Sequence, residues 1–373
     1  MKLLLITHDT SRTGAPMVLL HLLRWLKQHH PQVMVDVLAL KSGGLIKEFK
    51  ANCDEFYDYQ VFIKPEKPSL FKRVLFKFYN PTDRKKLLLN NLALKRYDVI
   101  YSNTVVTIPL ANSIVSLSPK SKWIAHIHEL NVIIKQLLPN IEDYAKAINK
   151  MIVPSKLVKA NICEEWVIDK RKVDVVYECS NVDVISSNTT SKKLFTVGAS
   201  GAVHWRKGHD MFIQVARYIK QHYPDVEIRF IWVGNISKNE QIIINEDLRK
   251  LKLKTNVSFI GEVENPHEYY QDFDVFLMTS REDPFPLVCI EVGQMGIPII
   301  CFEGATGTEE VVKKGGGFIV PYLNIEAMSE KVLSYYNDTN LKQNHGSINK
   351  IEFANFTPEV ICKQLFKVIQ TQI

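Results

Sequence analysis

The chain has 373 residues, 46% hydrophobic and 23% charged, a composition typical of a folded protein long enough for two domains. Lysine and arginine exceed aspartate and glutamate by seven, and no apolar run in the sequence is long enough to cross a bilayer. The six cysteines form no CxxC pair, which argues against a zinc site or a disulfide framework and favours a reducing, cytoplasmic compartment.

Short apolar strands alternate with helical stretches through the first half of the chain. The predicted strands are Leu3 to Ile6, Val33 to Leu40, Val99 to Tyr101, Trp123 to Ile127 and Met151 to Val153. Between the first two strands, a segment that opens with Gly14-Ala15-Pro16 has apolar residues at helical spacing. This alternation predicts a parallel sheet covered by helices on both faces.

A basic and apolar stretch extends from Phe71 to Lys95, where phenylalanine, leucine and valine alternate with lysine and arginine. This pattern fits a helix that lies on an anionic membrane surface, which would make the protein peripheral on the inner face of the cell membrane. It also fits an ordinary soluble helix with a buried stripe and a solvated face. The sequence leaves both interpretations open.

The second half repeats the same alternation after a polar segment, residues 186–193, which we predict to be a linker. The predicted strands are Leu194 to Val197, Ile228 to Val233, Val257 to Ile260, Val275 to Met278, Ile297 to Cys301 and Phe318 to Val320. We therefore predict an α/β protein with two doubly wound domains, 1–185 and 194–357, facing an interdomain cleft. The apolar spacing in residues 358–373 predicts an amphipathic helix at the end of the chain. We expect that this helix could pack against the first domain.

Two common nucleotide-binding motifs are missing from the sequence. No GxGxxG follows the first strand, and no GxxxxGK[ST] occurs. A Rossmann dehydrogenase and a P-loop NTPase are therefore disfavoured. The basic excess also lacks a recognisable nucleic-acid motif, so we expect no nucleic-acid partner.

A glycine loop with two cations opens the second predicted domain. Small residues from Gly198 to Ala202 precede Arg206 and Lys207, and a helical stretch follows them. Backbone N–H groups and fixed positive charge that converge at a helix start suit a phosphate group. An ordinary surface turn with two solvated cations would give the same pattern.

Two carboxylates, Asp283 and Glu291, flank the predicted start of a helix in SREDPFPLVCIEVGQMGIPIICF, residues 280–302. Seven residues separate them, about two helical turns, so that they could meet one extended ligand at two points. A carboxylate can accept hydrogen bonds from two neighbouring hydroxyls, as a ribose or a hexose offers them. Because Ile290 and Val292 flank Glu291, a merely solvated role is less favoured for this residue.

Polar residues also end two strands of the first predicted domain. His128 and Glu129 follow the strand Trp123 to Ile127, and alternation along the strand puts His126 on the same side as His128. Strand ends are where this class of sheet binds ligands, although a lone histidine is more often structural. We predict that His126, His128, Glu129 and Asn103 reach a ligand at this edge of the sheet.

Taken together, these stretches resemble the retaining glycosyltransferases of family four, a GT-B group within glycosyl transferases group 1. EDPFPLVCIEVGQMGIPII resembles the acidic-x7-acidic signature of that family. SRTGAPMVLLHLL is similar to its N-terminal glycine loop, IAHIHEL to its histidine strand end, WRKG to its phosphate-binding lysine and GTEEVV to its last donor loop.

The resemblance implies a role for each matching residue. Glu291 would hold the ribose of a nucleotide, Asp283 with Glu282 would lie beside the transferred sugar, and Lys207 would neutralise the diphosphate. Family members commonly carry an arginine where this chain has Gly201, and Arg206 is the candidate to replace it. His128 matches the active-site histidine better than His126 does, and contacts to the transferred sugar or acceptor are implied at His126, His128, Glu129 and Asn103. Further donor contacts are implied at Gly14, Val263, Phe285, Pro286, Leu287, Thr308 and Glu310.

The resemblance also implies an activity. It predicts transfer of a hexose or N-acetylhexosamine from a nucleotide-diphosphate sugar to a hydroxyl of a glycan or lipid-linked saccharide, with retention, as in polysaccharide synthesis. No metal and no cofactor beyond this substrate are expected, and His128, Asp283 and Lys207 are the candidate catalytic residues. Two alternatives remain: a nucleotide-sugar 2-epimerase of the same fold, and a partner subunit without activity.

Overall fold

The computed structural model describes residues 1–64, 83–182 and 194–373. The chain divides into a first unit, Met1–Val153 with Lys159–Val176 and Cys362–Ile373, and a second unit, Pro154–Val158 with Tyr177–Ile361. Tyr177 belongs to the second unit, where its ring packs against those of Phe285 and Phe356. The predicted linker, 186–193, lies outside the described residues.

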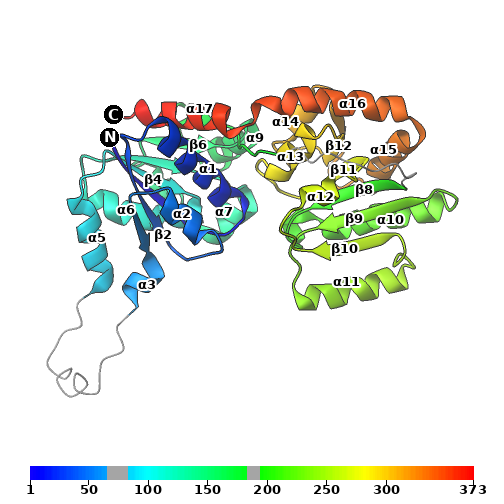
Figure 1. Ribbon diagram of the computed structural model, residues 1–373, viewed down its shortest axis with the longest axis horizontal. Helices are drawn as coiled ribbons and strands as arrows, with labels where there is room; N and C mark the ends of the chain where they lie inside the picture. The colour runs from blue at the N-terminus through cyan, green and yellow to red at the C-terminus, as the bar shows by residue number, and fades with distance from the viewer. Residues whose placement is uncertain (65–82, 183–193) are drawn as a thin grey trace, which may run out of the picture. The chain divides into compact units, whose positions relative to one another are not determined.

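A seven-stranded sheet in the order β3-β2-β1-β4-β5-β6-β7 forms the centre of the first unit (Figure 1). All of its neighbouring strands run parallel. The strands are β1 (Lys2–Thr7), β2 (Met34–Ala39), β3 (Glu55–Asp58), β4 (Val99–Asn103), β5 (Lys122–His126), β6 (Lys150–Val153) and β7 (Val173–Val175). Helices cover both faces of a parallel sheet, so the central strands are apolar along their length, as Leu3, Leu4 and Leu5 of β1 are.

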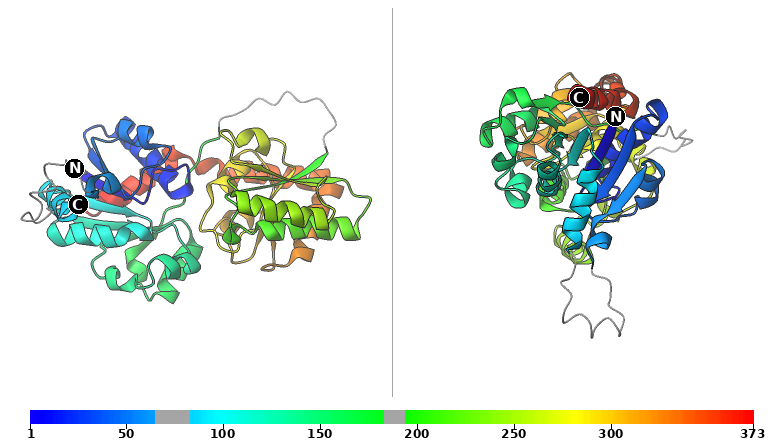
Figure 2. Two further views of the ribbon diagram at one scale, coloured as in Figure 1. Left: turned by 90° about the horizontal axis from the view of Figure 1, so that it is seen from below. Right: turned by 90° about the vertical axis from the view of Figure 1, so that its left-hand side faces the viewer.

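The helices of the first unit lie on both faces of its sheet (Figure 2). α17 (Pro358–Gln370) brings Phe366 against Trp25 of α1, with ring centroids 5.8 Å apart. The other helices are α1 (Gly14–His29), α2 (Ile46–Ala51), α3 (Tyr59–Ile63), α5 (Arg84–Leu94), η1 (Val105–Thr107), α6 (Ile108–Leu117), α7 (Asn131–Leu137), α8 (Glu142–Ala145), α9 (Lys156–Glu165) and η2 (Lys170–Lys172).

The second unit repeats the design with a six-stranded parallel sheet in the order β10-β9-β8-β11-β12-β13. Its strands are β8 (Phe195–Ser200), β9 (Ile228–Val233), β10 (Val257–Gly261), β11 (Val275–Met278), β12 (Ile299–Phe302) and β13 (Gly317–Val320). Its helices are η3 (Trp205–Lys207), α10 (His209–His222), α11 (Lys238–Lys250), α12 (His267–Tyr270), α13 (Leu287–Gln294), α14 (Glu309–Val312), α15 (Ile325–Asn337), α16 (Thr339–Glu352) and η4 (Phe353–Asn355).

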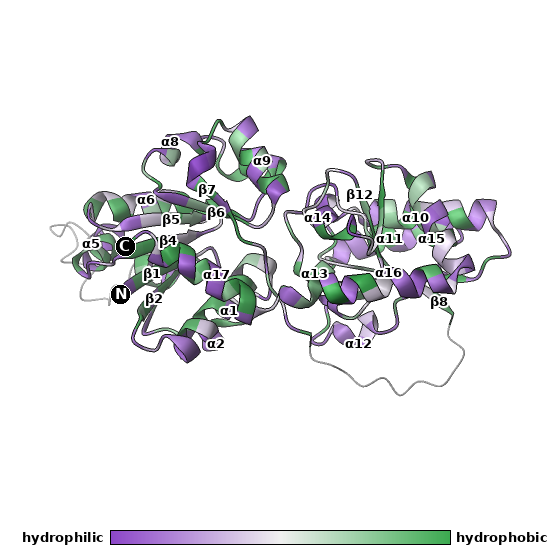
Figure 3. Ribbon diagram, turned by 90° about the horizontal axis from the view of Figure 1, so that it is seen from above, coloured by the Kyte–Doolittle hydropathy of each residue, from purple (hydrophilic) through white to green (hydrophobic). Residues whose placement is uncertain are grey.

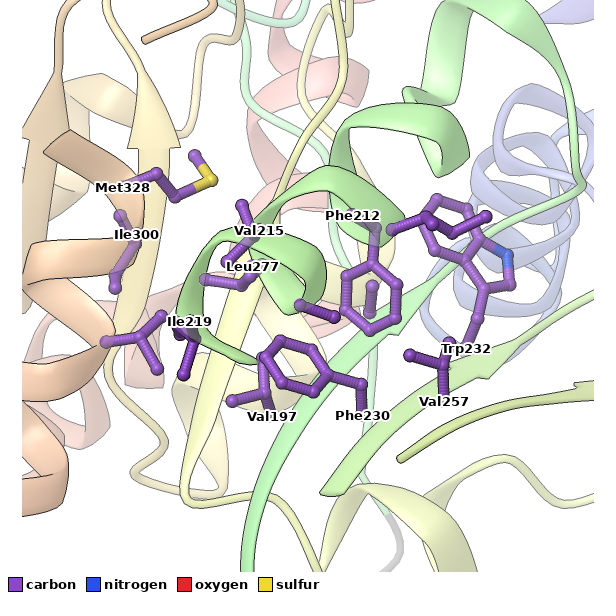
Figure 4. Close-up of a cluster of buried hydrophobic side chains, with 14 of the residues drawn as sticks. Val197, Phe212, Val215, Ile219, Phe230, Trp232, Val257, Leu277, Ile300 and Met328 are labelled. Carbon is purple, nitrogen blue, oxygen red and sulfur yellow. The ribbon is translucent and has the colours of Figure 1, made fainter. Parts of the chain in front are cut away.

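Two apolar cores sandwich this second sheet. On one face, Phe212 and Ile219 of α10 pack against Phe230 and Trp232 of β9, together with residues of α11 and α15 (Figure 4). On the other face, side chains of α12, α13 and α14 form a separate cluster around Phe276. Apolar burial on both faces explains why the strands read as nearly continuous hydrophobic runs.

Hydropathy follows the same layering. In Figure 3, β1 and β6 are mainly green, whereas the helices mix green and purple residues. Among the described residues, no helix combines the length and the apolar character needed to cross a bilayer.

Both sheets reverse their winding direction beside their first strand. In the first unit, β2 and β4 flank β1, and in the second unit β9 and β11 flank β8. A crevice opens at such a switch point, outside the carboxyl ends of the strands, and ligands of open α/β sheets bind there. Ligand-binding residues are therefore expected in the segments that follow β1, β4, β8 and β11.

Candidate functional site

The cationic turn that follows β8 is held tightly against the end of β11. Gly208 has φ +69°, and a Cβ at this position would lie 1.9 Å from the carbonyl oxygen of Thr279. Only glycine fits such a left-handed conformation at such a close approach. The His204 side chain accepts a hydrogen bond from the Arg206 N–H at 3.2 Å and so caps the 3-10 turn η3. The sequence thus places Arg206 and Lys207 directly before the N-terminus of α10.

A buried carboxylate binds both cations. Lys207 Nζ lies 2.6 Å from Asp283 Oδ2, Arg206 Nη1 lies 3.2 Å from Oδ1, and Ser280 Oγ donates to Oδ2 at 3.1 Å. Asp283 is only 4% exposed. Burial raises the pKa of this carboxyl, but the charges of Lys207 and Arg206 outweigh burial and hold the pKa below its usual value. Two positive charges against one negative charge leave the turn suited to an anion.

A second ion pair clamps the same turn. Arg281 donates to both carboxylate oxygens of Asp210, at 3.0 and 2.7 Å, and to the carbonyl oxygen of Trp205 at 2.8 Å. The Arg281 N–H also donates to the carbonyl oxygen of Arg206 at 2.8 Å. A bidentate arginine–carboxylate pair fixes geometry well, so it keeps the cations in place. Sequence reasoning missed this pair, because partners 71 residues apart carry no spacing signal.

Glu291 lies on α13 with each carboxylate oxygen near a polar side chain. Ser180 Oγ donates to Oε1 at 2.8 Å, and His267 Nε2 lies 3.6 Å from Oε2. The Glu291 side chain is 16% exposed and the His267 side chain 15%. The carboxylate is therefore oriented and partly accessible, which suits a diol. Ser180 and His267 were not predicted from the sequence, since both come from segments distant from α13.

Other predicted donor contacts have structural partners. Glu310 accepts hydrogen bonds from the backbone N–H groups of Lys156 and Leu157 at 2.7 and 3.1 Å and from Tyr177 Oη at 2.8 Å. Lys156 and Leu157 belong to the second unit, so this carboxylate caps the first turn of α9 from within the same unit. Phe285 is 3% exposed and packs its ring against those of Tyr177 and Phe356.

The remaining donor predictions fall on several elements. The Glu282 carbonyl oxygen accepts from Arg206 Nη1 at 2.8 Å, so Glu282 joins the Lys207–Arg206–Asp283 cluster through its backbone. Pro286 occupies the N-cap position of α13, and Leu287 is the first residue of that helix. Val263 is partly buried against the apolar core, and Thr308 is fully buried. Gly201 has φ +142°, a conformation that favours glycine over arginine.

An Asp-x-Asp pair, Asp272 and Asp274, has a structural role. Asp274 Oδ2 accepts from the Thr196 N–H at 2.8 Å, and its other oxygen pairs with Lys342. Thr196 is the second residue of β8, whereas the cationic turn follows the last residue of that strand. Asp274 therefore ties helix α16 to the amino edge of the sheet, away from Lys207.

The first unit places two imidazoles against each other at the end of β5. We predicted a strand to Ile127, but β5 ends at His126. The ring centroids of His126 and His128 lie 3.8 Å apart, and His126 Nδ1 is 2.6 Å from Tyr101 Oη. His126 is 1% exposed, and its Nε2 has no hydrogen-bond partner among the described residues. Burial, with the charge of His128, lowers the pKa of His126 well below its usual value.

His128 is held by its backbone and by its ring. Its N–H donates to Glu129 Oε2 at 2.9 Å, and its Nε2 lies 2.8 Å from Asn103 Oδ1. Asn103, the last residue of β4, is fully buried, and its Nδ2 donates to the Ala15 carbonyl oxygen at 3.0 Å. The structure thus brings His126, His128, Glu129 and Asn103 together. The contacts to a sugar or acceptor predicted for them stay predictions.

Gly14 and His8 complete this edge of the sheet. Gly14 is the first residue of α1, and a Cβ there would meet no described atom within 4 Å. The chain itself therefore does not demand glycine at this position, and the predicted donor contact of Gly14 stays a prediction. His8 was not predicted; burial and the charge of His128 lower the pKa of His8, against the opposing effect of Asp9.

Comparison with known proteins adds an independent observation. Residues 183–351 match the model of the family Glycosyl transferases group 1. The amylovoran biosynthesis glycosyltransferase AmsD of Erwinia amylovora is 22% identical over 244 residues, 60% of this chain and 66% of that protein. The capsular polysaccharide biosynthesis glycosyltransferase CapM of Staphylococcus aureus is 24% identical over 209 residues, 56% of this chain and 52% of that protein. The chain thus spans about half to two thirds of the length of these curated relatives.

Solved structures extend the likeness to the whole chain. HepE of Anabaena, crystallised in complex with UDP and glucose, is similar over 99% of both chains with a TM-score of 0.80 and 18% sequence identity, which shows a common fold. The GT-B architecture of two Rossmann-like parallel-sheet domains that the sequence predicted is thereby confirmed, in a chain whose residues 183–351 match Glycosyl transferases group 1.

Proposed function

We propose that the protein is a glycosyltransferase of polysaccharide synthesis. It transfers a sugar, a hexose or an N-acetylhexosamine, from a nucleotide-diphosphate donor to a hydroxyl of a glycan or lipid-linked saccharide. The observation that carries this proposal is the pair of cations, Lys207 and Arg206, held by Asp283 at the switch point of the second sheet, with Glu291 on the following helix. The family match over the same unit supports it.

The chemistry fits the charges of this turn. When the bond between the anomeric carbon and the diphosphate oxygen breaks, the diphosphate leaves with the electron pair and gains negative charge. Lys207 and Arg206 stabilise that charge because they are already fixed in place before the reaction. The acceptor oxygen forms the new bond to the anomeric carbon, and its proton passes to the departing diphosphate. We propose that the anomeric configuration is retained and that no metal ion is needed.

The carboxylates of the second unit and the histidine edge of the first unit each have a role in this proposal. Glu291 accepts hydrogen bonds from the ribose diol, and Asp283 orients Lys207 and Arg206 beside the transferred sugar. His128, with His126, Asn103 and Glu129, contacts the transferred sugar or the acceptor; these roles remain predictions.

Thermal unfolding in the presence of nucleotides tests the donor site. Because HepE was crystallised with UDP, we would first compare UDP, GDP, ADP and UDP-glucose. A nucleotide that binds the folded protein raises the midpoint of thermal unfolding. At concentrations well above Kd, this rise grows with the logarithm of the nucleotide concentration. Glu291→Gln removes one acceptor and should abolish most of this rise. Glu246→Gln, which changes an exposed carboxylate on α11, is the matched control and should leave the rise intact.

The same assay mixture separates the proposal from its alternatives. Donor sugar incubated with a saccharide acceptor should yield a longer saccharide whose new linkage retains the donor configuration. Donor alone that is converted into its 2-epimer would identify an epimerase instead, and purified protein that neither transfers nor hydrolyses any donor would identify a partner subunit. Unchanged transfer in excess EDTA would support a mechanism without a metal.

We also propose a peripheral cytoplasmic location on an anionic membrane. Residues 71–82 of the basic stretch lie outside the described residues. On the described α5, Leu87 is 43% exposed and follows Lys85 and Lys86, and Leu94 is 77% exposed and precedes Lys95. Exposed leucines next to cations suit an anionic lipid surface. Co-sedimentation with vesicles should rise with their anionic lipid content and fall when Lys85 and Lys86 become glutamine; binding that ignores lipid charge would reject this location.

A further inference from the structure

The second unit carries two exposed aromatic side chains, Trp205 and Tyr322, with exposed fractions of 48% and 51%. In residues 1–64, 83–182 and 194–373, no other aromatic side chain is exposed to this degree. Trp205 belongs to η3, directly before the two cations, and Tyr322 lies just beyond the end of β13. Removing such rings from water is favourable, so an exposed pair of them marks a binding surface.

Both rings lie beside one arginine. Arg281 Cζ lies over the Trp205 ring, 5.6 Å from the ring centroid. The pKa of Arg281 is raised mainly by its hydrogen bonds to Asp210, against the effect of burial, and also by the charge of the nearby Tyr322. Arg281 follows β11, which lies between β8 and β13 in the strand order. Trp205 and Tyr322 therefore approach Arg281 from segments on either side of it.

The two rings are held in place by their neighbours. The bidentate pair with Asp210 fixes Arg281, whose guanidinium covers one face of the Trp205 indole, so the exposed surface of the indole is its other face. The Tyr322 ring meets the ring of buried Phe302, with centroids 6.2 Å apart and an interplanar angle of 72°. Rings that are oriented in advance lose little conformational freedom when a ligand binds.

The surroundings of the two rings suit a sugar. A pyranose presents C–H bonds on its faces and hydroxyl groups around its rim, so it can stack on an aromatic ring while its rim forms hydrogen bonds. The Asp210 carboxylate is half-exposed and keeps lone pairs beyond the two that Arg281 uses. His204 and Glu303, exposed polar residues before Trp205 and after β12, lie at the same edge of the sheet. Acceptors and donors thus surround the apolar rings.

The ribose contact proposed for Glu291 lies elsewhere in this unit. α10 packs on one face of the sheet, whereas α13, which carries Glu291, packs on the other. Trp205 belongs to the α10 side, because Arg281 links it to Asp210 in the first turn of that helix. A nucleotide held by Glu291 therefore does not account for the two exposed rings.

We propose that Trp205 and Tyr322 form a stacking site for a saccharide of two or more sugar rings, the chain that the protein extends. β8 and β13 are three strand spacings apart, about 14 Å, which is longer than a single sugar ring. The identity of this saccharide as the acceptor rests on the proposed function. Its binding to the two rings can be measured without any donor.

Fluorescence can report on Trp205 separately, because the other four tryptophans, Trp25, Trp123, Trp166 and Trp232, are buried. In the full-length protein, iodide should quench Trp205 far more than the rest. We would add cellohexaose, maltohexaose, mannohexaose and chitohexaose in turn, with glucose and UDP for comparison. At least one hexaose should protect Trp205 from iodide at a concentration at which glucose does not. Protection by UDP but by no hexaose, or by none of these compounds, would overturn the proposal.

Two variants test the stacking itself. Trp205→Ala should weaken binding of the protecting hexaose about tenfold, and Tyr322→Ala about threefold, as expected when a stacked ring is removed. Isothermal titration calorimetry measures both losses. Ile242→Ala, which shortens an exposed apolar side chain on α11, is the matched control and should bind like the wild type.

Folding and activity are read out separately. Because the three side chains are exposed, the unfolding midpoints of all three variants should equal that of the wild type, so that lost binding is not lost structure. Wild-type affinity in both Trp205→Ala and Tyr322→Ala would reject the stacking site. In transfer assays, KM for the acceptor should rise in these two variants while KM for the donor stays unchanged. Absence of transfer in the wild type would count against the proposed function, whereas hexaose binding would still decide the stacking site.

Discussion

The two units share one sheet design but use opposite chemistry at corresponding strand ends. In the second unit, the segments after β8 and β11 form a cluster of ions, in which Lys207 and Arg206 share the Asp283 carboxylate. In the first unit, the segments after β4 and β5 form a cluster of amide and imidazole groups, Asn103, His126 and His128. The same fold therefore positions an ionic cluster in one copy and a cluster of amide and imidazole groups in the other.

The electrostatics of the two clusters differ accordingly. The cations of the second unit lower the pKa of Asp283, so the carboxylate stays ionised well into acid. Burial in the first unit lowers the pKa values of His126 and His8, so these imidazoles stay neutral. Acidification should therefore weaken the first unit at a higher pH than the second, which makes the contrast measurable.

The largest expected effect is the loss of Lys207. Lys207→Ala should lower kcat/KM for transfer about 1,000-fold, because a fixed cation no longer meets the charge on the leaving diphosphate. Steady-state kinetics would measure this loss. Lys250→Ala, on the exposed surface of α11, is the matched control and should retain wild-type kinetics. Equal kinetics for both variants would show that Lys207 does not bind the diphosphate. The proposed chemical difference between the two units would then be rejected.

Asp283→Asn should next destabilise the second unit. It leaves two neighbouring cations without their buried carboxylate, and the unfolding free energy should fall by about 3 kcal/mol at pH 7. Since the folded-state pKa of Asp283 is lowered, its contribution is complete above the unfolded pKa of about 4 and is lost as the pH falls further. Urea unfolding at pH 7 and pH 3 would show a large difference from wild type at the first pH and a smaller one at the second.

A smaller effect is expected from His126 in the first unit. Its folded-state pKa is lowered, so the unfolded chain takes up a proton below about pH 6.5 and the folded chain does not. Wild-type stability should therefore decrease by about 2 kcal/mol between pH 6.5 and pH 5, and His126→Gln should lack this slope. Hydrogen exchange of β5 peptides would follow the first unit alone. His222→Gln, an exposed control on α10, should keep the wild-type slope; a slope unchanged in His126→Gln would contradict the assignment.

The strands show how much of the fold could be predicted from the sequence. Each of the predicted strands is present, and two match to the residue, β9 and β11. Long apolar runs bounded by turn residues gave that signal. The edge strands β3 and β7 were missed, because EFYD and VDV are short and carry charges, and only pairing with a neighbouring strand makes them strands.

The site was predictable where its signal was local. The spacing of Asp283 and Glu291, the adjacency of Arg206 and Lys207, and the alternation of His126 and His128 are all visible in short stretches. The partners of these groups were not visible. Arg281 with Asp210, Ser180 with Glu291, and Tyr177 with Glu310 each join segments far apart in the chain.

The sequence by itself determined the alternation of buried strands and helices, because apolar periodicity is a property of neighbouring residues. It also determined which ionisable residues follow those strands. Only the tertiary structure decided what each of them does: Asp283 binds two cations, Glu310 caps α9, and Asn103 contacts the His128 ring. Hydrogen bonds and ion pairs act over a few ångströms of space, and the folded chain alone brings such distant residues within that range.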